Sequence, residues 1–407
     1  MLSDEVIDKV VERLVERMES ANTFILKKIG ENIKLLKSLT PTEARQMIQI
    51  LRYGGDFDKI LKELQKITNL NVKDIYEIFE EVAKNDYNFA KQFYDYRKKP
   101  FIPFEKNETL KKQINALAKI SAGDYINLTN TRAIGFTVKD LNGRSVFKRL
   151  DKAYVDILDE AVLDISQGKE TFGVVLNRMI KQFGESGLKT MDYESGRSIR
   201  LDSAIRMNIK GALRALHNEI QQELGEEFDA DGVEISVHSN PAPDHEEVQG
   251  HQFSNEEFEK FQNDLDSVDY YGEIFTADYN GKDRRAISQY NCYHYVFSIV
   301  LGVNRPQYSS EQLRQIIEDN NKGFELDGKH YTNYEGTQLQ RALERKIREQ
   351  KDIQIMARES GNNELVESSQ KNITDLSRKY KELSEISKLP TKLQRMRVSG
   401  YKRVKTT

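Results

Sequence analysis

The N-terminal stretch up to Leu36 carries one continuous apolar stripe at helical spacing, and this stripe constrains the fold more than any other feature of the sequence. Apolar residues recur every three or four positions among charged neighbours, at Val6, Val10, Leu14, Met18, Ala21, Ile25, Ile29, Ile33 and Leu36. Residues spaced in this way share one face of a helix, so the stripe predicts a long amphipathic helix. Such a helix must bury its apolar face against other elements, and we therefore expect an elongated helical N-terminal region.

Helical patterns continue through the first half of the chain. We predict helices at about 57–67, 72–84, 86–97, 108–128, 147–183 (two helices) and 202–224, with a break at Gly54–Gly55 and a short hairpin of strands at 189–193 and 198–200. The segment 98–104 (KKPFIPF) is expected to be a linker, because Pro100 and Pro103 cannot lie inside a helix.

The character of the sequence changes at residue 231. The stretch 233–238 (VEISVH) alternates apolar and polar residues, which predicts a half-buried strand. From there to about residue 310 the chain is rich in Tyr, Gly, Asn, Asp and His, and helical patterns return after Ser309. The predicted fold is mainly α: an elongated helical N-terminal part, a small α+β module and a C-terminal helical tail. We expect four regions, at 1–104, 105–230, 231–310 and 311–407.

Composition limits the class of protein. Hydrophobic residues make up 38% of the chain and charged residues 31%, which fits elongated helices with much exposed surface. A single cysteine excludes an internal disulfide framework. No stretch approaches the roughly 18 to 20 apolar residues of a membrane span, and the start (MLSDEVIDKV) is too acidic for a secretory signal. We expect a protein made in a cytoplasm, with no membrane partner.

The module at 231–310 holds four of the six histidines and the lone cysteine. His238, His245, Cys292 and His294 have the ligand types that zinc prefers. We therefore expect either zinc or no cofactor at all. Only Cys292-x-His294 is a tight pair, whereas structural zinc sites usually have two. The alternatives are hydrogen-bonding core residues, or a thiol hydrolase that pairs the cysteine with a histidine base. Two residues on the same face of a strand rarely point at each other well enough for proton transfer, which favours the core interpretation over the hydrolase.

The C-terminal segment is basic. From Ile386 to the end there are seven lysines and arginines and no acid: Lys388, Lys392, Arg395, Arg397, Lys402, Arg403 and Lys405. One alternative is a disordered, solubilising end. The other is a DNA-binding segment whose cations contact phosphates without sequence preference and in a salt-dependent way.

Motifs in the second half of the chain resemble those of the phage minor capsid protein 2 family, within the broader group of Mu-type head-morphogenesis proteins. The pattern is Ser-x-His at the end of a strand, a second His, Gln-Gly, Asn-Cys-x-His, Gly-Val-x-x-Pro and Tyr-x-x-Tyr-x-x-x-Gln in an Arg-rich helix. The matching residues are Ser236, His238, His245, Gln249, Gly250, Asn291, Cys292, His294, Gly302, Val303, Pro306, Tyr331, Tyr334, Gln338 and Arg341. The family usually has a small residue and an arginine where this chain has Pro241 and Ala242, and an aromatic residue where it has Val248.

The resemblance implies a structural virion component in the phage head. Such proteins are similar to head proteins that associate with the portal and the major capsid protein, act in assembly and are present in few copies. No enzymatic activity is firmly attached to the family, so we predict a non-enzyme. Two alternatives stay open: a metal-dependent or thiol hydrolase carried in the virion, and an internal head protein that binds packaged DNA through the basic tail.

Overall fold

The computed structural model describes residues 4–37, 43, 56–69, 72–130, 133–139, 143–153, 156, 171–191, 197–238, 240–279, 282–283, 285–288, 292 and 294–405. The predicted break at Gly54–Gly55, the boundary between the two helices predicted within 147–183, and Asn291 lie outside these residues.

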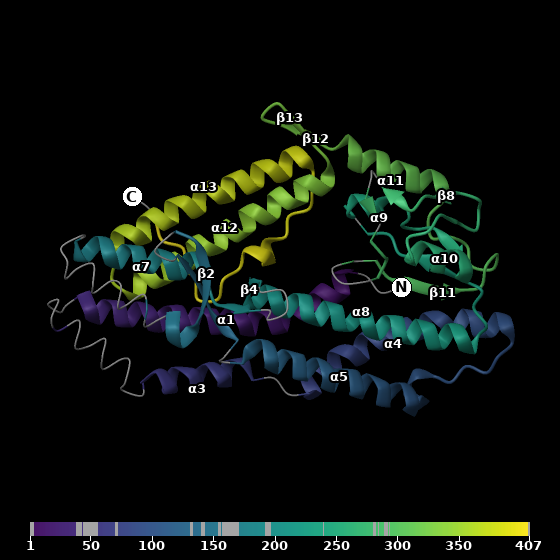
Figure 1. Cartoon of the computed structure of the whole chain (residues 1–407), viewed down its shortest axis with the longest axis horizontal. Coiled ribbons are helices and arrows are strands. Elements are labelled where there is room, and N and C mark those ends of the chain that lie inside the picture. The colour runs from purple at the N-terminus through teal and green to yellow at the C-terminus, as the bar shows by residue number, and fades with distance from the viewer. Residues whose placement is uncertain are drawn as a thin grey trace.

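Long helices dominate the molecule and run along its long axis (Figure 1). The helices are α1 (Asp4–Lys37), α3 (Asp56–Thr68), α4 (Val72–Arg97), α5 (Glu108–Thr129), α7 (Phe172–Ser186), α8 (Leu201–Glu227), α9 (Pro243–Glu246), α10 (Asn255–Gln262), α11 (Ser310–Lys322), α12 (Asn333–Glu359) and α13 (Asn363–Ser387), with short 3-10 helices η1 (Phe104–Lys106) and η2 (Leu393–Met396). Helix α1 packs against α8 and α12, so the first helix of the chain contacts one of the last.

The strands form small sheets. A four-stranded antiparallel sheet has the order β2-β1-β3-β4, and a three-stranded antiparallel sheet has the order β11-β5-β6. Three two-stranded hairpins pair β7 with β8, β9 with β10 and β12 with β13. The bounds are β1 (Ile134–Lys139), β2 (Ser145–Arg149), β3 (Lys189–Met191), β4 (Ser198–Arg200), β5 (Gly232–Ile235), β6 (Gln252–Ser254), β7 (Ser267–Val268), β8 (Ile274–Phe275), β9 (Asp278–Tyr279), β10 (Lys282–Asp283), β11 (Val296–Ile299), β12 (Phe324–Leu326) and β13 (Lys329–Tyr331).

The predicted apolar stripe of α1 is buried. Of its described side chains, none is more than 4% exposed: Leu14, Met18, Ala21, Ile25, Ile29, Ile33 and Leu36. They belong to one large hydrophobic core that also takes in α4, α5, α7, α8, β11 and the C-terminal part of α12. A smaller core lies inside the α+β module, around Phe253 and Phe261. The predicted fold class, mainly α with a small α+β module, is confirmed; the four domain boundaries stay predictions.

Helix α4 corrects the prediction of two helices at 72–84 and 86–97. It runs through Asn85 and Asp86, polar residues that usually favour helix ends. The Asn85 amide donates to the carbonyl of Glu81 within the helix. Asp86 is fully buried, and its carboxylate lies 2.6 Å from Nδ1 of His217 on α8. A tertiary partner thus stabilises a residue that local propensity would place at a break.

Two further predictions are wrong in detail. Residues 147–149, expected at the start of a helical stretch, belong to strand β2, which pairs with β1 from Lys139 opposite Ser145 to Gly135 opposite Arg149. Strand β5 is buried on both faces rather than half-buried. Its outward residue, Glu234, is only 2% exposed because Gln252, Asn304 and the backbone N–H of Gln307 donate hydrogen bonds to its carboxylate.

The basic C-terminal segment packs along the helices, so it is not the disordered end that one alternative assumed. Residues 388–405 run back over α13, α12 and α1, and Leu389, Met396 and Val398 are buried. The hydroxyl of Thr23 on α1 donates to the carbonyl of Ser399 at 2.7 Å. The hydroxyl of Tyr401 donates to the amide oxygen of Gln370 on α13 at 3.0 Å.

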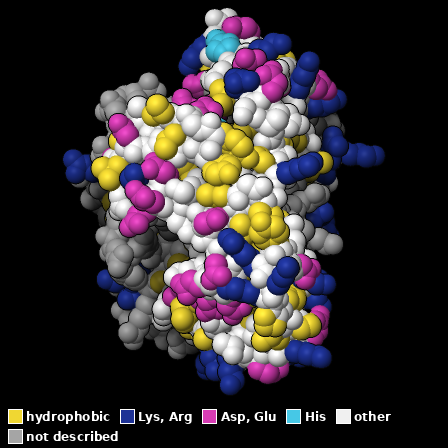
Figure 2. Space-filling model, turned by 90° about the vertical axis from the view of Figure 1, so that its right-hand side faces the viewer, with side chains coloured by type: hydrophobic (Ala, Val, Ile, Leu, Met, Phe, Trp, Pro, Cys, Tyr) yellow, Lys and Arg dark blue, Asp and Glu magenta, His cyan; other side chains and the backbone are white. Residues whose placement is uncertain are grey.

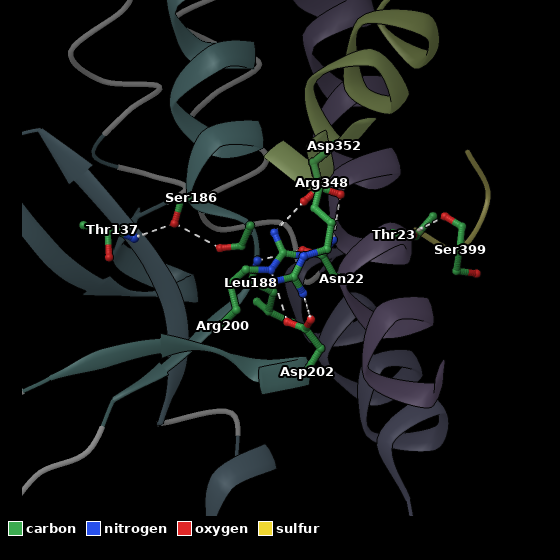
Figure 3. A network of polar contacts seen from close by, with 11 residues as sticks. Asn22, Thr23, Thr137, Ser186, Leu188, Arg200, Asp202, Arg348, Asp352 and Ser399 are labelled. Atoms are coloured by element: carbon green, nitrogen blue, oxygen red, sulfur yellow. Dashed lines mark hydrogen bonds and ion pairs between the residues drawn. The ribbon is translucent and has the colours of Figure 1, made fainter. Parts of the chain in front are cut away.

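A buried polar network joins the distant parts of the helical body (Figure 3). Arg200, at the end of β4, contacts Asp202 at the start of α8 and Asp352 on α12. Asn22 on α1 donates to Asp352 and accepts from the backbone N–H of Leu188. The network fixes α1, β4, α8 and α12 at one point. Within the described part of the chain, no helix is both long and apolar enough to cross a membrane.

Candidate functional site

The structure brings three of the four predicted ligand residues together. Sγ of Cys292 lies 3.6 Å from Nδ1 of His245 and 3.5 Å from Nδ1 of His294. All three side chains are buried, and their three ligand atoms lie within 4.8 Å of one another. The fourth residue, His238, lies beside the group: its ring centroid is 4.4 Å from that of His294. We refer to His245, Cys292 and His294 as the His/Cys cluster.

Pairing of two strands places these residues. Val296 at the start of β11 is opposite Ile235 at the end of β5, so the chain just before β11 meets the chain just after β5. Cys292 and His294 lie in that preceding segment and His238 in the following one. Helix α9, which begins at Pro243, carries His245 over the same point. Cys292 and His294 are not on a strand, so the prediction that they share a strand face is wrong, and with it the expectation that they point past each other.

The second ring nitrogen of each clustered histidine faces an oxygen. Nε2 of His245 lies 2.8 Å from the backbone carbonyl of Arg285. Nε2 of His294 lies 3.3 Å from the amide oxygen of Gln249. The backbone N–H of His238 donates to the same Gln249 oxygen, which fixes the orientation of that amide. A carbonyl and an amide oxygen only accept, so both Nε2 atoms carry a proton, and in the neutral form of each ring Nδ1 presents its lone pair to the sulfur.

The environment of the sulfur favours the thiolate. Backbone N–H groups of Ser288 and His294 donate to Sγ at 3.3 and 3.4 Å. Burial by itself would raise the pKa of the Cys292 thiol, but the hydrogen bond and charge of His245, with the two N–H groups, hold this pKa below its usual value. Burial would likewise lower the pKa of His245, yet its contact with Cys292 raises it. Burial, together with the charges of His238 and His245, lowers the pKa of His294 to about 2, so that ring is neutral.

The His/Cys cluster forms part of the wall of a cavity of about 330 Å³. The opposite wall comes from α12, with Tyr334, Gln338, Arg341 and Glu344, and from the C-terminal segment. Among the described residues, five lysines and arginines line the cavity against one acid: Lys210, Arg285, Arg341, Lys392 and Arg395, with Glu344. The cavity is therefore an electropositive space between the module and the C-terminal helices.

Sequence reasoning did not assign the α12 residues to this site. The resemblance did single out Tyr334, Gln338 and Arg341, but only as parts of a motif more than forty residues beyond Cys292. Their place on the cavity wall depends on how α12 packs against the module. The sequence signal for these residues was therefore the motif itself, which includes both the segment around Cys292 and the start of α12 that line the cavity.

A second group of possible ligands, not predicted, lies within the module. His251, Asp269 and Glu273 have ligand atoms within 4.8 Å of one another. Nδ1 of His251 is 2.7 Å from the Asp269 carboxylate, which also accepts from the backbone N–H groups of Tyr271 and Glu273. Each of these contacts satisfies a polar group inside a loop. The group is therefore explained as a buried structural pair.

The seven basic residues of the tail do not form one surface. Lys392 and Arg395 line the cavity, and Arg397 lies 3.8 Å from Glu16 of α1. Lys388, Lys402, Arg403 and Lys405 are exposed. DNA binding by this segment stays a prediction, and the exposed cations are its remaining candidates.

The end of the molecule that carries the module has a mixed surface (Figure 2). Basic, acidic and hydrophobic side chains are interspersed on this face, and no single sign of charge covers it. Exposed apolar groups occur on the hairpin of β7 and β8, where Tyr270, Tyr271 and Ile274 are 47%, 57% and 72% exposed. Monomeric proteins seldom expose large apolar side chains in a group, so this hairpin is a candidate contact surface.

Comparison with known proteins gives one match. The family model of phage minor capsid protein 2 matches residues 2–384 of the chain. Neither a curated protein nor a solved structure matches it. The match spans the helical body, the module and α12 as well as the motifs around the His/Cys cluster.

Proposed function

Because this chain belongs to the phage minor capsid protein 2 family, we propose that it acts in head assembly, associated with the portal and the interior of the capsid. The observation that carries the proposal is the family match over residues 2–384, which includes nearly every element of the fold. A capsid family is a structural family, so we propose a virion component rather than an enzyme.

The form of the molecule supports this role. Long helices that share one large hydrophobic core make an elongated body (Figure 1). The exposed hairpin at one end, with Tyr271 and Ile274, offers an apolar surface to a second protein. We propose that this hairpin contacts the portal, because a group of large exposed apolar side chains is typical of a protein-contact surface.

Mass spectrometry and electron microscopy of virions test the proposal. Purified mature heads are expected to contain peptides of this chain in fewer copies than the major capsid protein. A nonsense mutation in its gene is expected to give aberrant heads, and expression from a plasmid restores them. Two results together would exclude the proposal: wild-type virions that contain no peptides of the chain, and normal heads in the nonsense mutant.

A variant pair tests the contact surface. Ile274→Asp places a charge on the exposed hairpin and is expected to reduce copies of the protein per head. Ile126→Asp, at a position on α5 that is 58% exposed, is the matched control and is expected to be incorporated normally. Equal incorporation of both variants would mean that the hairpin is not the docking surface.

One observation favours a second candidate, a hydrolase carried in the virion. Cys292 and His245 form a thiol–imidazole pair at a cavity wall, which is the arrangement of a cysteine nucleophile and its base. A hydrolase predicts that Cys292→Ala protein enters heads at normal copy number while infectivity falls. Normal infectivity together with normal incorporation would remove this candidate.

A further inference from the structure

The spacing of the three donor atoms in the His/Cys cluster is that of ligands around one metal ion. Zinc–sulfur bonds are about 2.3 Å long and zinc–nitrogen bonds about 2.05 Å, so a tetrahedral angle separates sulfur and nitrogen ligands by about 3.5 Å. The observed separations of Cys292 Sγ from Nδ1 of His245 and of His294 are 3.6 and 3.5 Å. The two Nδ1 atoms lie within 4.8 Å of each other, so all three donor atoms surround one point.

The number of protons available between the sulfur and the two Nδ1 atoms distinguishes a metal site from a hydrogen-bonded cluster. With both rings neutral, both Nδ1 atoms carry a lone pair, because each Nε2 donates its proton, one to the Arg285 carbonyl and one to the Gln249 amide oxygen. A thiol has one proton and can donate it to one of the two rings. The other ring then points its lone pair at the lone pairs of the sulfur. Moving the thiol proton to His245 leaves the same conflict, since His294 then faces a thiolate.

A cation between the three atoms removes this conflict, because it accepts all three lone pairs. The surroundings are those that hold ligands in place at metal sites. Ligating histidines usually donate their second N–H to a carbonyl or carboxylate, as both do here. Two backbone N–H groups, from Ser288 and His294, point at the sulfur, which suits a thiolate better than a thiol.

We propose that His245, Cys292 and His294 bind one zinc ion through Nδ1, Sγ and Nδ1, with the fourth coordination position open to the cavity. Nitrogen and thiolate ligands together select zinc over calcium or magnesium. His238 is not one of the three residues whose ligand atoms are mutually close, although it lines the same cavity. Three protein ligands and one open position are the arrangement of zinc sites that bind water or a small ligand. Binding releases the thiol proton of Cys292.

A nucleophilic cysteine explains the same residues less completely. A thiol–imidazole pair needs one histidine, with its second nitrogen held by an acceptor. Here a second buried histidine, His294, is also held in a fixed orientation. Its Nε2 faces the amide oxygen of Gln249, which also accepts from the backbone N–H of His238. A nucleophile has no use for that second lone pair, whereas a metal ion does.

Metal analysis and cobalt substitution of the full-length protein test the proposal. The protein is expected to contain one zinc per chain after purification. Replacing zinc by Co²⁺ is expected to give a thiolate-to-cobalt charge-transfer band and the intense visible bands of four-coordinate cobalt. A full-length protein that folds, takes up no stoichiometric metal and shows no charge-transfer band would overturn the proposal without any variant.

Variants locate the site. Cys292→Ser is expected to abolish the charge-transfer band. Gln249→Met is expected to weaken zinc binding about 10- to 100-fold, since it leaves the three ligands in place and removes the oxygen that accepts from His294 and from the backbone N–H of His238. His251→Asn and His330→Asn, one in the other ligand group and one on the surface, are the controls and are expected to bind zinc normally. Metal loss in His251→Asn with retention in Cys292→Ser would place the site elsewhere and overturn the proposal.

Azide tests the open position. In the cobalt-substituted protein it is expected to shift the visible bands, because it replaces the ligand that faces the cavity. An unchanged spectrum would mean that a fourth protein group closes the site, and would overturn that part of the proposal.

Discussion

Nη1 of Arg200 lies 2.7 Å from a carboxylate oxygen of Asp352, although the two residues are 152 positions apart in the sequence. Asp352 is fully buried and Arg200 nearly so. A second carboxylate, Asp202, contacts both Arg200 and Arg348. Burial by itself would raise the pKa of Asp202, but the two arginines hold it at about 2. The strand β4, the start of α8 and α12 therefore meet at a compact set of buried charges (Figure 3).

Removing one member of this set is expected to destabilise the whole helical body. Arg200→Met leaves the Asp352 carboxylate buried with Asn22 as its remaining partner, and breaking a buried pair costs about 3–5 kcal/mol. Chemical denaturation should show this loss in the free energy of unfolding. Arg378→Met is the matched control. Arg378 and its partner Asp375 are both largely exposed, so this variant is expected to change stability little.

The double variant Arg200→Met with Asp352→Leu refines this prediction. It removes the uncompensated charge, so it is expected to recover part of the stability that Arg200→Met loses. A double variant as unstable as the single one would mean that Asp202 and Arg348, rather than Asp352, determine the cost.

The pH dependence of stability should depend on Glu19 of α1. Burial, and then the nearby carboxylates of Asp202 and Glu12, raise the pKa of Glu19 from 4.5 to about 8, against the opposing charges of Arg348 and Arg200. Between these two pH values the folded state holds a proton that the unfolded state has lost. The free energy of unfolding is therefore expected to fall as the pH rises from about 4.5 to about 8.

Glu19→Gln should remove most of this decline, because the amide carries no titrating proton. Denaturation of the two proteins across that pH range measures the difference, which is expected to be on the order of a few kcal/mol at the upper end. Lys351, whose pKa is affected by the Glu19 charge, must be monitored in the same comparison. Parallel curves for the two proteins would contradict the assignment to Glu19.

Local patterns predicted the elements whose partners matter little. The stripe of α1 and the hairpin of β3 and β4 both follow from residues near in sequence. Helix α4 did not, because His217 on another helix stabilises Asp86 in its middle. Strand β2 did not, because an isolated five-residue pattern cannot be separated from a helix end.

The candidate site shows the same division. The sequence singled out His245, Cys292 and His294, which the structure brings together, but it treated Cys292 and His294 as neighbours on a strand. Their actual geometry depends on the meeting of two chain segments at Ile235 and Val296. The orienting role of Gln249 and the cavity wall on α12 arise only from tertiary packing. The sequence indicated which residues could form a site, but not that the fold brings their side chains together at one cavity.

Replacing glycine by alanine is expected to lower stability at Gly184, where α7 packs closely on α12, and to raise it at Gly211 on α8. A Cβ at Gly184 would lie 2.5 Å from Cγ1 of Ile353 and 2.8 Å from its backbone N, so Gly184→Ala forces the helices apart. Overpacking of this kind costs about 1–3 kcal/mol and outweighs the helix propensity of alanine. Gly211→Ala on α8 meets nothing within 4 Å and is expected to stabilise by about 0.5–1 kcal/mol. Thermal unfolding of both variants measures this; a shift of the same sign in both would contradict it.

The basic tail leads to the last prediction. If it contacts packaged DNA, its exposed cations do so, because Lys392 and Arg395 line the cavity. The variant Lys402→Gln, Arg403→Gln, Lys405→Gln is expected to weaken duplex binding and to reduce its salt dependence by up to about three counterions. Tyr401 and its bond to Gln370 remain, so folding is preserved. The control is Lys379→Gln, Lys381→Gln on α13, which removes exposed charge elsewhere. Unchanged, salt-insensitive binding by the triple variant and the wild type alike would exclude the tail as a DNA-binding segment.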